Sequence, residues 1–85
     1  MTFALARNVT ATETEDGTVL LDQRSGRYWQ LNGTASTVLH ALLAGRPAED
    51  AAALLRERHP RGSERAAEDV AELVTALRDA KLVTS

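Results

Sequence analysis

The pattern of apolar residues changes once along this chain, close to Asn32, and that change constrains the fold more than any other feature. Before it, β-branched residues in short extended runs predict strands; after it, apolar residues recur at helical spacing. A chain of 85 residues can bury only one compact core. We therefore expect a single α+β domain over residues 1–85, in which strands come first and helices follow.

Three strands are predicted before the change. Residues 9–14 (VTATET) are rich in β-branched side chains, and Glu15-Asp16-Gly17 supplies an Asp-Gly pair that favours a tight hairpin turn. A second strand is predicted over 18–22 and a third over 27–31, with Gly26 at positive φ in the turn between them. Three successive strands joined by short turns predict an antiparallel meander.

Three helices are predicted after the change. The first is capped by Asn32 or Thr34 and ends at Gly45, the second has Pro47 in its first turn and is closed by RHPRG at 58–62, and Ser63 can cap the third. Each helix carries an apolar stripe. The stripes are Ala35, Val38, Leu39 and Leu42; Ala51, Leu54 and Leu55; and Ala66, Val70, Leu73, Val74 and Leu77.

The order of these elements, with Leu82 and Val83 folding back onto the core, predicts a winged helix-turn-helix-like domain. A three-stranded antiparallel sheet is followed by three helices.

Composition removes several classes of function. The chain has no Cys, so it has no disulfide, no thiolate nucleophile and no cysteine-ligated zinc, and we expect no metal or cofactor. No apolar run approaches the ~20 residues of a membrane helix, and the N-terminal MTFALARN is too short for a signal peptide, so we expect a cytoplasmic protein with no membrane partner. The net charge of -2, with acids and bases interspersed, disfavours a nucleic-acid partner.

Catalysis is not predicted. Acid-base or nucleophilic chemistry needs a tuned group in a sheltered cleft, and the chain has only two histidines. We expect His40 to lie packed or half-exposed beside the apolar stripe of the first helix, and His59 to be a solvated loop residue. No glycine-rich phosphate loop follows a strand.

A small winged-helix DNA-binding regulator is the alternative interpretation. A recognition helix presents Arg, Lys, Asn or Gln to base edges, whereas acids crowd the third helix. These acids are Glu64, Glu68, Asp69, Glu72 and Asp79. The cations that keep the alternative open are Arg56, Arg58, Arg61 and Arg65.

The third strand is a candidate peptide-binding edge. If the strand order follows the sequence, residues 27–31 have one unpaired edge, which carries no proline and no lysine. We expect Trp29 and Leu31 to face one side of the strand, and Arg27, Tyr28 and Gln30 to face the other side or the rim. Leu31 is expected in the core, and Trp29 either in the core or in the groove. The same edge could instead pair with a second copy of the chain.

Two stretches carry a resemblance to a known family. At YWQLNGTASTVLHALLAG and again at DVAELVTALRDAKLV the chain resembles the PqqD-like family, and its short form is similar to the stand-alone leader-recognition proteins of lasso-peptide biosynthesis. The matching positions are Leu31, Asn32, Ala35, Val38, Leu42 and Gly45, and then Asp69, Val70, Leu73, Leu77, Leu82 and Val83.

The resemblance implies a recognition element for ribosomally synthesised precursor peptides, without catalytic activity. It implies that the leader of the precursor adds as an antiparallel strand to the third strand, against the third helix. It also implies partners, namely a leader peptidase and an ATP-dependent macrolactam synthetase. The leader-binding residues would be Arg27, Tyr28, Trp29, Gln30, Leu31, Asp69, Val70, Glu72, Leu73, Val74, Leu77 and Arg78.

Roles follow from this placement. Tyr28 and Trp29 would form one aromatic wall of the groove. The opposite wall would be the apolar side chains of the third helix, and Asp69, Glu72 and Arg78 would hold the rim.

Overall fold

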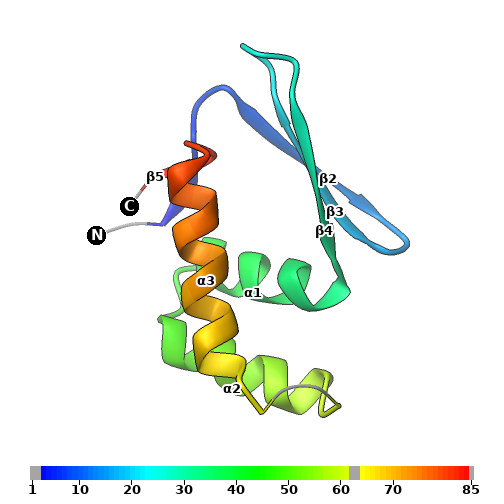
Figure 1. Ribbon diagram of the computed structural model, residues 1–85, viewed down its shortest axis with the longest axis vertical. Coiled ribbons are helices and arrows are strands. Elements are labelled where there is room, and N and C mark those ends of the chain that lie inside the picture. The colour runs from blue at the N-terminus through cyan, green and yellow to red at the C-terminus, as the bar shows by residue number, and fades with distance from the viewer. Residues whose placement is uncertain (1–2, 62–63, 85) are drawn as a thin grey trace.

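The computed structural model describes residues 3–61 and 64–84, and Figure 1 shows a strand ribbon standing beside a group of three helices. The three-stranded antiparallel sheet followed by three helices is confirmed. The elements are β1 (Ala4–Leu5), β2 (Val9–Thr14), β3 (Gly17–Asp22), β4 (Tyr28–Asn32), α1 (Gly33–Leu43), α2 (Ala48–Arg58), α3 (Ala66–Asp79) and β5 (Val83–Thr84).

The main sheet has the order β2-β3-β4. Thr14 pairs with Gly17, so Glu15 and Asp16 make the hairpin turn and Gly17 is the first residue of β3. A Cβ atom on Gly17 would collide with the backbone carbonyl oxygen of Leu31 in β4. Glycine is therefore required where β3 passes the end of β4.

Local signals set the helix boundaries. Asn32 rather than Thr34 caps α1, because its Oδ1 accepts the Ala35 N–H at 2.9 Å and the Thr34 hydroxyl at 2.8 Å. Gly45 follows the helix with φ of 90°, as expected for a helix end. Arg65 occupies the cap position of α3 without a side-chain cap bond, and the predicted cap, Ser63, lies outside the described residues.

The core consists of two adjoining clusters. One joins α1, α2 and α3, and the other joins the sheet, α1 and the end of α3; Phe3 and Leu73 pack against both. Leu20 and Leu39 are completely buried in the second cluster. Leu82 and Val83 return to this core as predicted, and Val83 also pairs with Leu5, which forms the small sheet of β1 and β5.

Within residues 3–61 and 64–84, none of the helices has the length and apolarity needed to cross a membrane.

Candidate functional site

β4 forms an open margin of the main sheet. It pairs with β3 on one side, and no strand pairs with its other side among residues 3–61 and 64–84. The backbone groups on that side are available to another chain.

The hydrogen bonds of the preceding turn show which backbone groups these are. The carbonyl oxygen of Arg27 accepts from the Asp22 N–H at 2.8 Å, so Arg27 directs its carbonyl toward β3. Backbone groups alternate between the two sides of a strand. Trp29 and Leu31 therefore bond to β3, whereas the N–H and C=O groups of Tyr28 and Gln30 point to the open side.

Side chains alternate between the faces of β4 as well. Trp29 and Leu31 are half-buried and pack against the second core cluster, while Gln30 is exposed and Tyr28 is 66% exposed. Arg27 precedes β4, is exposed, and borders a shallow depression with Tyr28 and Trp29 at the start of the strand. Tyr28 and Trp29 point to opposite faces and do not form one wall.

Leu31 is also less buried than expected. It packs on the core cluster but remains half-buried, because β4 lies at the margin of the sheet. Its exposed part, like that of Trp29, is therefore accessible from the helical side of β4.

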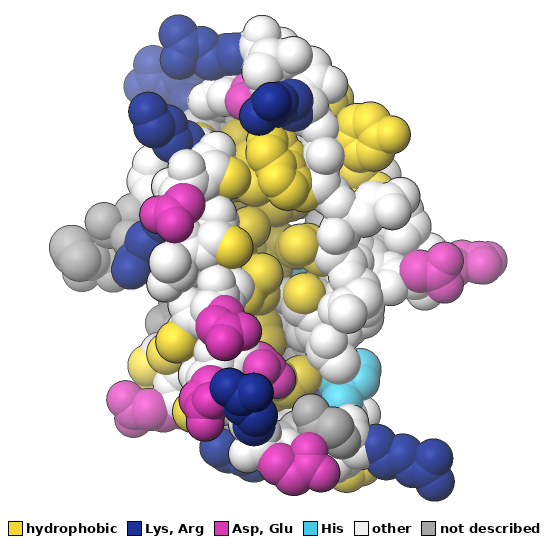
Figure 2. All heavy atoms as spheres, in the orientation of Figure 1, with side chains coloured by type: hydrophobic (Ala, Val, Ile, Leu, Met, Phe, Trp, Pro, Cys, Tyr) yellow, Lys and Arg dark blue, Asp and Glu magenta, His cyan; other side chains and the backbone are white. Residues whose placement is uncertain are grey.

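The wall opposite β4 comes from one flank of α3. Asp69 and Leu73 line a pocket beside β4, and Ala76 and Ala80 follow on the same flank at helical spacing. Ala80 packs against the same core cluster as Trp29 and Leu31. We call the space between this flank and the open side of β4 the β4–α3 groove. Figure 2 shows a band of hydrophobic side chains along it.

The other predicted residues of α3 lie elsewhere. Val70 and Leu77 are 1% and 3% exposed, so they form core rather than wall. Val74 packs against the cluster of α1 and α2, and Arg78 follows one turn later, exposed on the same flank. Glu72 is exposed and borders a shallow depression with Thr75, Ala76 and Asp79, so it lies next to the groove flank.

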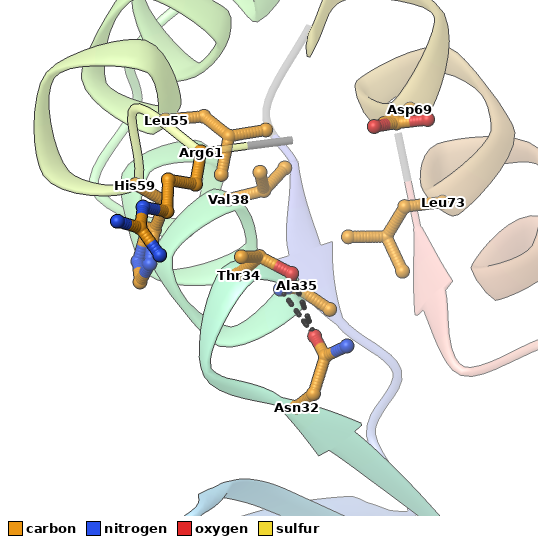
Figure 3. Close-up of a pocket in the computed structure, with 9 residues that line it drawn as sticks. All are labelled: Asn32, Thr34, Ala35, Val38, Leu55, His59, Arg61, Asp69 and Leu73. Atoms are coloured by element: carbon orange, nitrogen blue, oxygen red, sulfur yellow. Dashed lines mark hydrogen bonds between the residues drawn. The ribbon is translucent and has the colours of Figure 1, made fainter. Parts of the chain in front are cut away.

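A pocket of about 290 Å³ opens where β4 passes into α1. Figure 3 shows Asp69 and Leu73 of α3 on one side, α2 and the residues after it on the other, and α1 between them. Ala35, Val38, Leu55 and Leu73 make it apolar, whereas Asn32, Thr34, His59, Arg61 and Asp69 supply polar groups. Such a lining fits an apolar side chain with a polar end.

His59 belongs to this pocket, which the sequence interpretation missed. It caps the end of α2, is half-buried, and its Nε2 lies 3.2 Å from the Thr37 hydroxyl, so it is not a solvated loop residue. The His-Pro pair predicted a helix end, but only the crossing of α2 over α1 brings that end to the pocket. His40 is exposed, with its Nε2 3.0 Å from Glu13 Oε1 and 3.4 Å from the Thr18 hydroxyl.

The arginines in and after the last turn of α2 have different surroundings. Arg65 donates to Glu68 Oε2 from both Nε and Nη2, at 2.9 and 2.5 Å, and Arg61 lines the pocket. Arg56 and Arg58 lie exposed in the last turn of α2.

The β3–β4 turn is organised around Asp22. Its Oδ1 accepts from the Asn8 side chain at 2.6 Å and from the Arg24 N–H at 2.9 Å, and its Oδ2 accepts from the Ser25 hydroxyl at 3.0 Å. These hydrogen bonds hold the pKa of Asp22 below its ordinary value of 3.8, and the bond from the Asn8 side chain has the largest effect. Gly26 closes the turn with φ of 75°. The turn thus fixes the start of β4.

Known proteins resemble the chain over most of its length. The sequence model of the family described as coenzyme PQQ synthesis protein D (PqqD) matches residues 17–83. A structure described as lasso peptide synthetase B1 complexed with the leader peptide is 36% identical, with a TM-score of 0.88 and complete coverage of both chains. No curated protein matches.

A second structure, TbiB1 in complex with the TbiA(beta) leader peptide, has a TM-score of 0.82 and covers 96% of this chain and 95% of its own. At 20% identity, this likeness shows the fold alone.

Proposed function

The chain belongs to the PqqD family, and from that premise we propose that it binds the leader of a ribosomally synthesised lasso precursor peptide, as a recognition element without catalytic activity. The leader adds to the open side of β4 as an antiparallel strand and lies in the β4–α3 groove. The observation that carries this proposal is an unpaired strand edge beside an apolar groove.

The 36% identical structure supports the same function. It is described as complexed with a leader peptide, and it aligns with this chain from end to end. The chain therefore has the relative's whole framework, including β4 and α3.

Backbone pairing alone does not supply tight binding. Each net hydrogen bond contributes about 0.5 to 1.5 kcal/mol, so the N–H and C=O groups of Tyr28 and Gln30 together contribute roughly 2 to 6 kcal/mol. Micromolar affinity requires about 8 kcal/mol. Side chains of the leader must provide the remainder. The pocket between Leu55 and Leu73 suits such an anchor, which can contribute about 2 kcal/mol or more.

The bound leader then presents the precursor to a separate leader peptidase and to an ATP-dependent macrolactam synthetase. An extended leader loses entropy when it orders on the protein, which moderates the affinity. Moderate affinity suits an adaptor that must release its cargo after processing.

The test is a titration of the fluorescein-labelled leader of a lasso precursor peptide from the same genome, against wild type and the variants Gln30→Pro and Gln30→Ala. Proline at 30 removes the N–H that faces the open side, and leaves the bonds between β3 and β4 in place. Gln30→Ala keeps that N–H and removes the same side chain.

We expect wild type to bind at submicromolar Kd, Gln30→Ala within about threefold of it, and Gln30→Pro at least about tenfold more weakly. Circular dichroism and thermal midpoints verify that both variants are folded. Equal binding by Gln30→Pro would contradict strand addition. A duplex DNA titrated in parallel tests the alternative, because binding of the duplex without the leader would make the chain a DNA-binding protein.

A further inference from the structure

Four cations lie at the end of the molecule where β4 begins. Arg24 and Arg27 belong to the turn between β3 and β4. In the same turn the Gln23 N–H donates to the carbonyl oxygen of Asn8 at 2.8 Å, and Asn8 directly follows Arg7 in the sequence. The Ala6 N–H donates to the Leu82 carbonyl at 2.9 Å, next to Lys81. These bonds join the turn, the start of β2 and the end of α3. We call Arg7, Arg24, Arg27 and Lys81 the basic end; Figure 2 shows Lys and Arg side chains gathered there, at the top.

The cations of the basic end are exposed. No carboxylate forms an ion pair with any of these four side chains in the part of the chain that the structure describes. Asp22 lies in the same turn, but its oxygens accept from Asn8, Arg24 N–H and Ser25 instead. Asp79, in the last turn of α3, borders a shallow depression with Glu72, Thr75 and Ala76 and forms no ion pair within residues 3–61 and 64–84.

Lys81 adopts an unusual backbone conformation. Its φ is 60°, and its N–H and that of Leu82 close the end of α3 on the Arg78 and Leu77 carbonyls, at 2.9 and 3.0 Å. Glycine normally takes this position because a Cβ is disfavoured there. Lysine is therefore a costlier choice than glycine at this position. The helix dipole favours a cation here, but it does not explain Arg24 and Arg27.

The polarity of β4 tells which part of a bound leader meets this end. β4 runs from Tyr28 at the basic end to Asn32 at the pocket. An antiparallel leader strand therefore begins at the pocket and leaves the groove past Tyr28. Arg27, which borders a depression with Tyr28 and Trp29, is the first cation on that path.

Building on the proposed function, we infer that the basic end binds acidic side chains of the precursor, in the segment directly C-terminal to the strand that adds to β4. The occupant is an Asp- or Glu-bearing stretch of the leader itself. Charge pairing there holds the leader in one register as it leaves the groove, which backbone bonds alone do not specify.

The test uses the same labelled leader and a second version in which every Asp and Glu C-terminal to the added strand is changed to Asn or Gln. Both are titrated against wild type and the triple variant Arg24→Gln, Arg27→Gln, Lys81→Gly. The salt concentration is varied from about 50 to 400 mM, because exposed charges are screened over this range. Arg46→Gln is the matched control, since Arg46 lies on the α1–α2 turn beside Asp50 and Glu57.

We expect the triple variant to weaken binding of the unmodified leader at least about tenfold at low salt and only about twofold at high salt. The neutralised leader should bind wild type equally weakly, and the triple variant should cause no further loss with it, as a double-mutant cycle requires. Arg46→Gln should bind like wild type. Lys81→Gly alone should not lower the thermal midpoint.

Several results would overturn the inference while leaving the proposed function intact. One is a triple variant that binds the leader like wild type; another is an equal loss of affinity for both leaders. A third is a triple variant that binds the leader with unchanged affinity but no longer supports cleavage by the peptidase. That result would mean that the basic end binds the processing enzyme instead of the leader. A leader without Asp or Glu in that segment also contradicts it. If wild type does not bind the leader at all, the proposed function itself is wrong.

Discussion

At the scale of residues, the alternation of side chains along β4 places two neighbouring aromatic residues, Tyr28 and Trp29, on opposite faces of the strand. Trp29 packs on the core from the groove side, whereas the Tyr28 ring stands on the opposite face. A leader strand paired with β4 would place side chains on both faces, so Tyr28 would meet the proposed leader strand as a cross-strand neighbour rather than as a pocket wall.

The pocket is the place where one substitution separates binding from stability. Ala35 is half-buried and lines the pocket, so Ala35→Leu would fill the space that we propose for a leader side chain without opening a cavity. We expect this variant to bind the labelled leader at least about tenfold more weakly, because an anchor of about 2 kcal/mol is excluded. Fluorescence anisotropy measures the affinity, and thermal unfolding verifies the fold.

Ala53→Leu is the matched control, since Ala53 is exposed on α2 and takes the same added volume outside the groove. Its affinity should equal that of wild type. If Ala35→Leu also binds normally, the leader does not use this pocket.

Asp22 makes the stability of the β3–β4 turn depend on pH. Its pKa is lowered in the folded protein, so the charged form is favoured by folding and its contribution is present above the unfolded value. The contribution is lost as the pH falls through the folded pKa. We expect Asp22→Asn to be less stable than wild type at neutral pH and the difference to shrink between about pH 4 and pH 2.

Urea unfolding at several pH values measures this difference. Glu15→Gln removes one carboxylate from the exposed hairpin turn and controls for net charge. A difference between wild type and Asp22→Asn that stays constant down to about pH 2 would show that the hydrogen bonds, and not the charge, carry the effect.

At the scale of elements, β3 and β4 depend on one glycine. Gly17 has φ of 156°, and a Cβ there would strike the Leu31 carbonyl at the end of β4. We expect Gly17→Ala to destabilise the fold by about 1 to 3 kcal/mol and to weaken leader binding, because the collision displaces β4. Gly45→Ala provides a comparison, since φ is 90° there but no atom lies within 4 Å of the added Cβ.

Thermal unfolding and leader titration together read out both effects. Gly45→Ala should lower stability through backbone strain alone and leave leader affinity unchanged. Normal leader affinity in a folded Gly17→Ala variant would show that the position of β4 tolerates the change.

Element order was predictable because its signals are local. The Asn32 cap, Gly26 in its turn and Gly45 after α1 act within a few residues, and the structure confirms each of them. The pairing of β1 with β5 was not predictable, because two-residue strands almost a chain length apart carry no periodic pattern. Likewise, the sequence predicted the apolar stripe of α3. The stripe shows which residues pack in the core, but it does not show which flank of α3 faces β4.

At the scale of the whole molecule, the groove has two unlike ends. An apolar pocket with polar rim groups lies where β4 meets α1, and exposed cations lie where β4 begins. The sequence could predict the open margin of the meander. It could not predict that Leu55, His59 and Arg61 reach the pocket, since this depends on how α2 crosses α1 and meets α3.

The most direct measurement is amide hydrogen exchange, followed residue by residue, with and without the labelled leader. We predict that the leader slows exchange at the Tyr28 and Gln30 N–H groups, which face the open side of β4, and changes exchange at Trp29 and Leu31 much less. Leader binding that leaves Tyr28 and Gln30 exchanging at their free rates would contradict strand addition at β4.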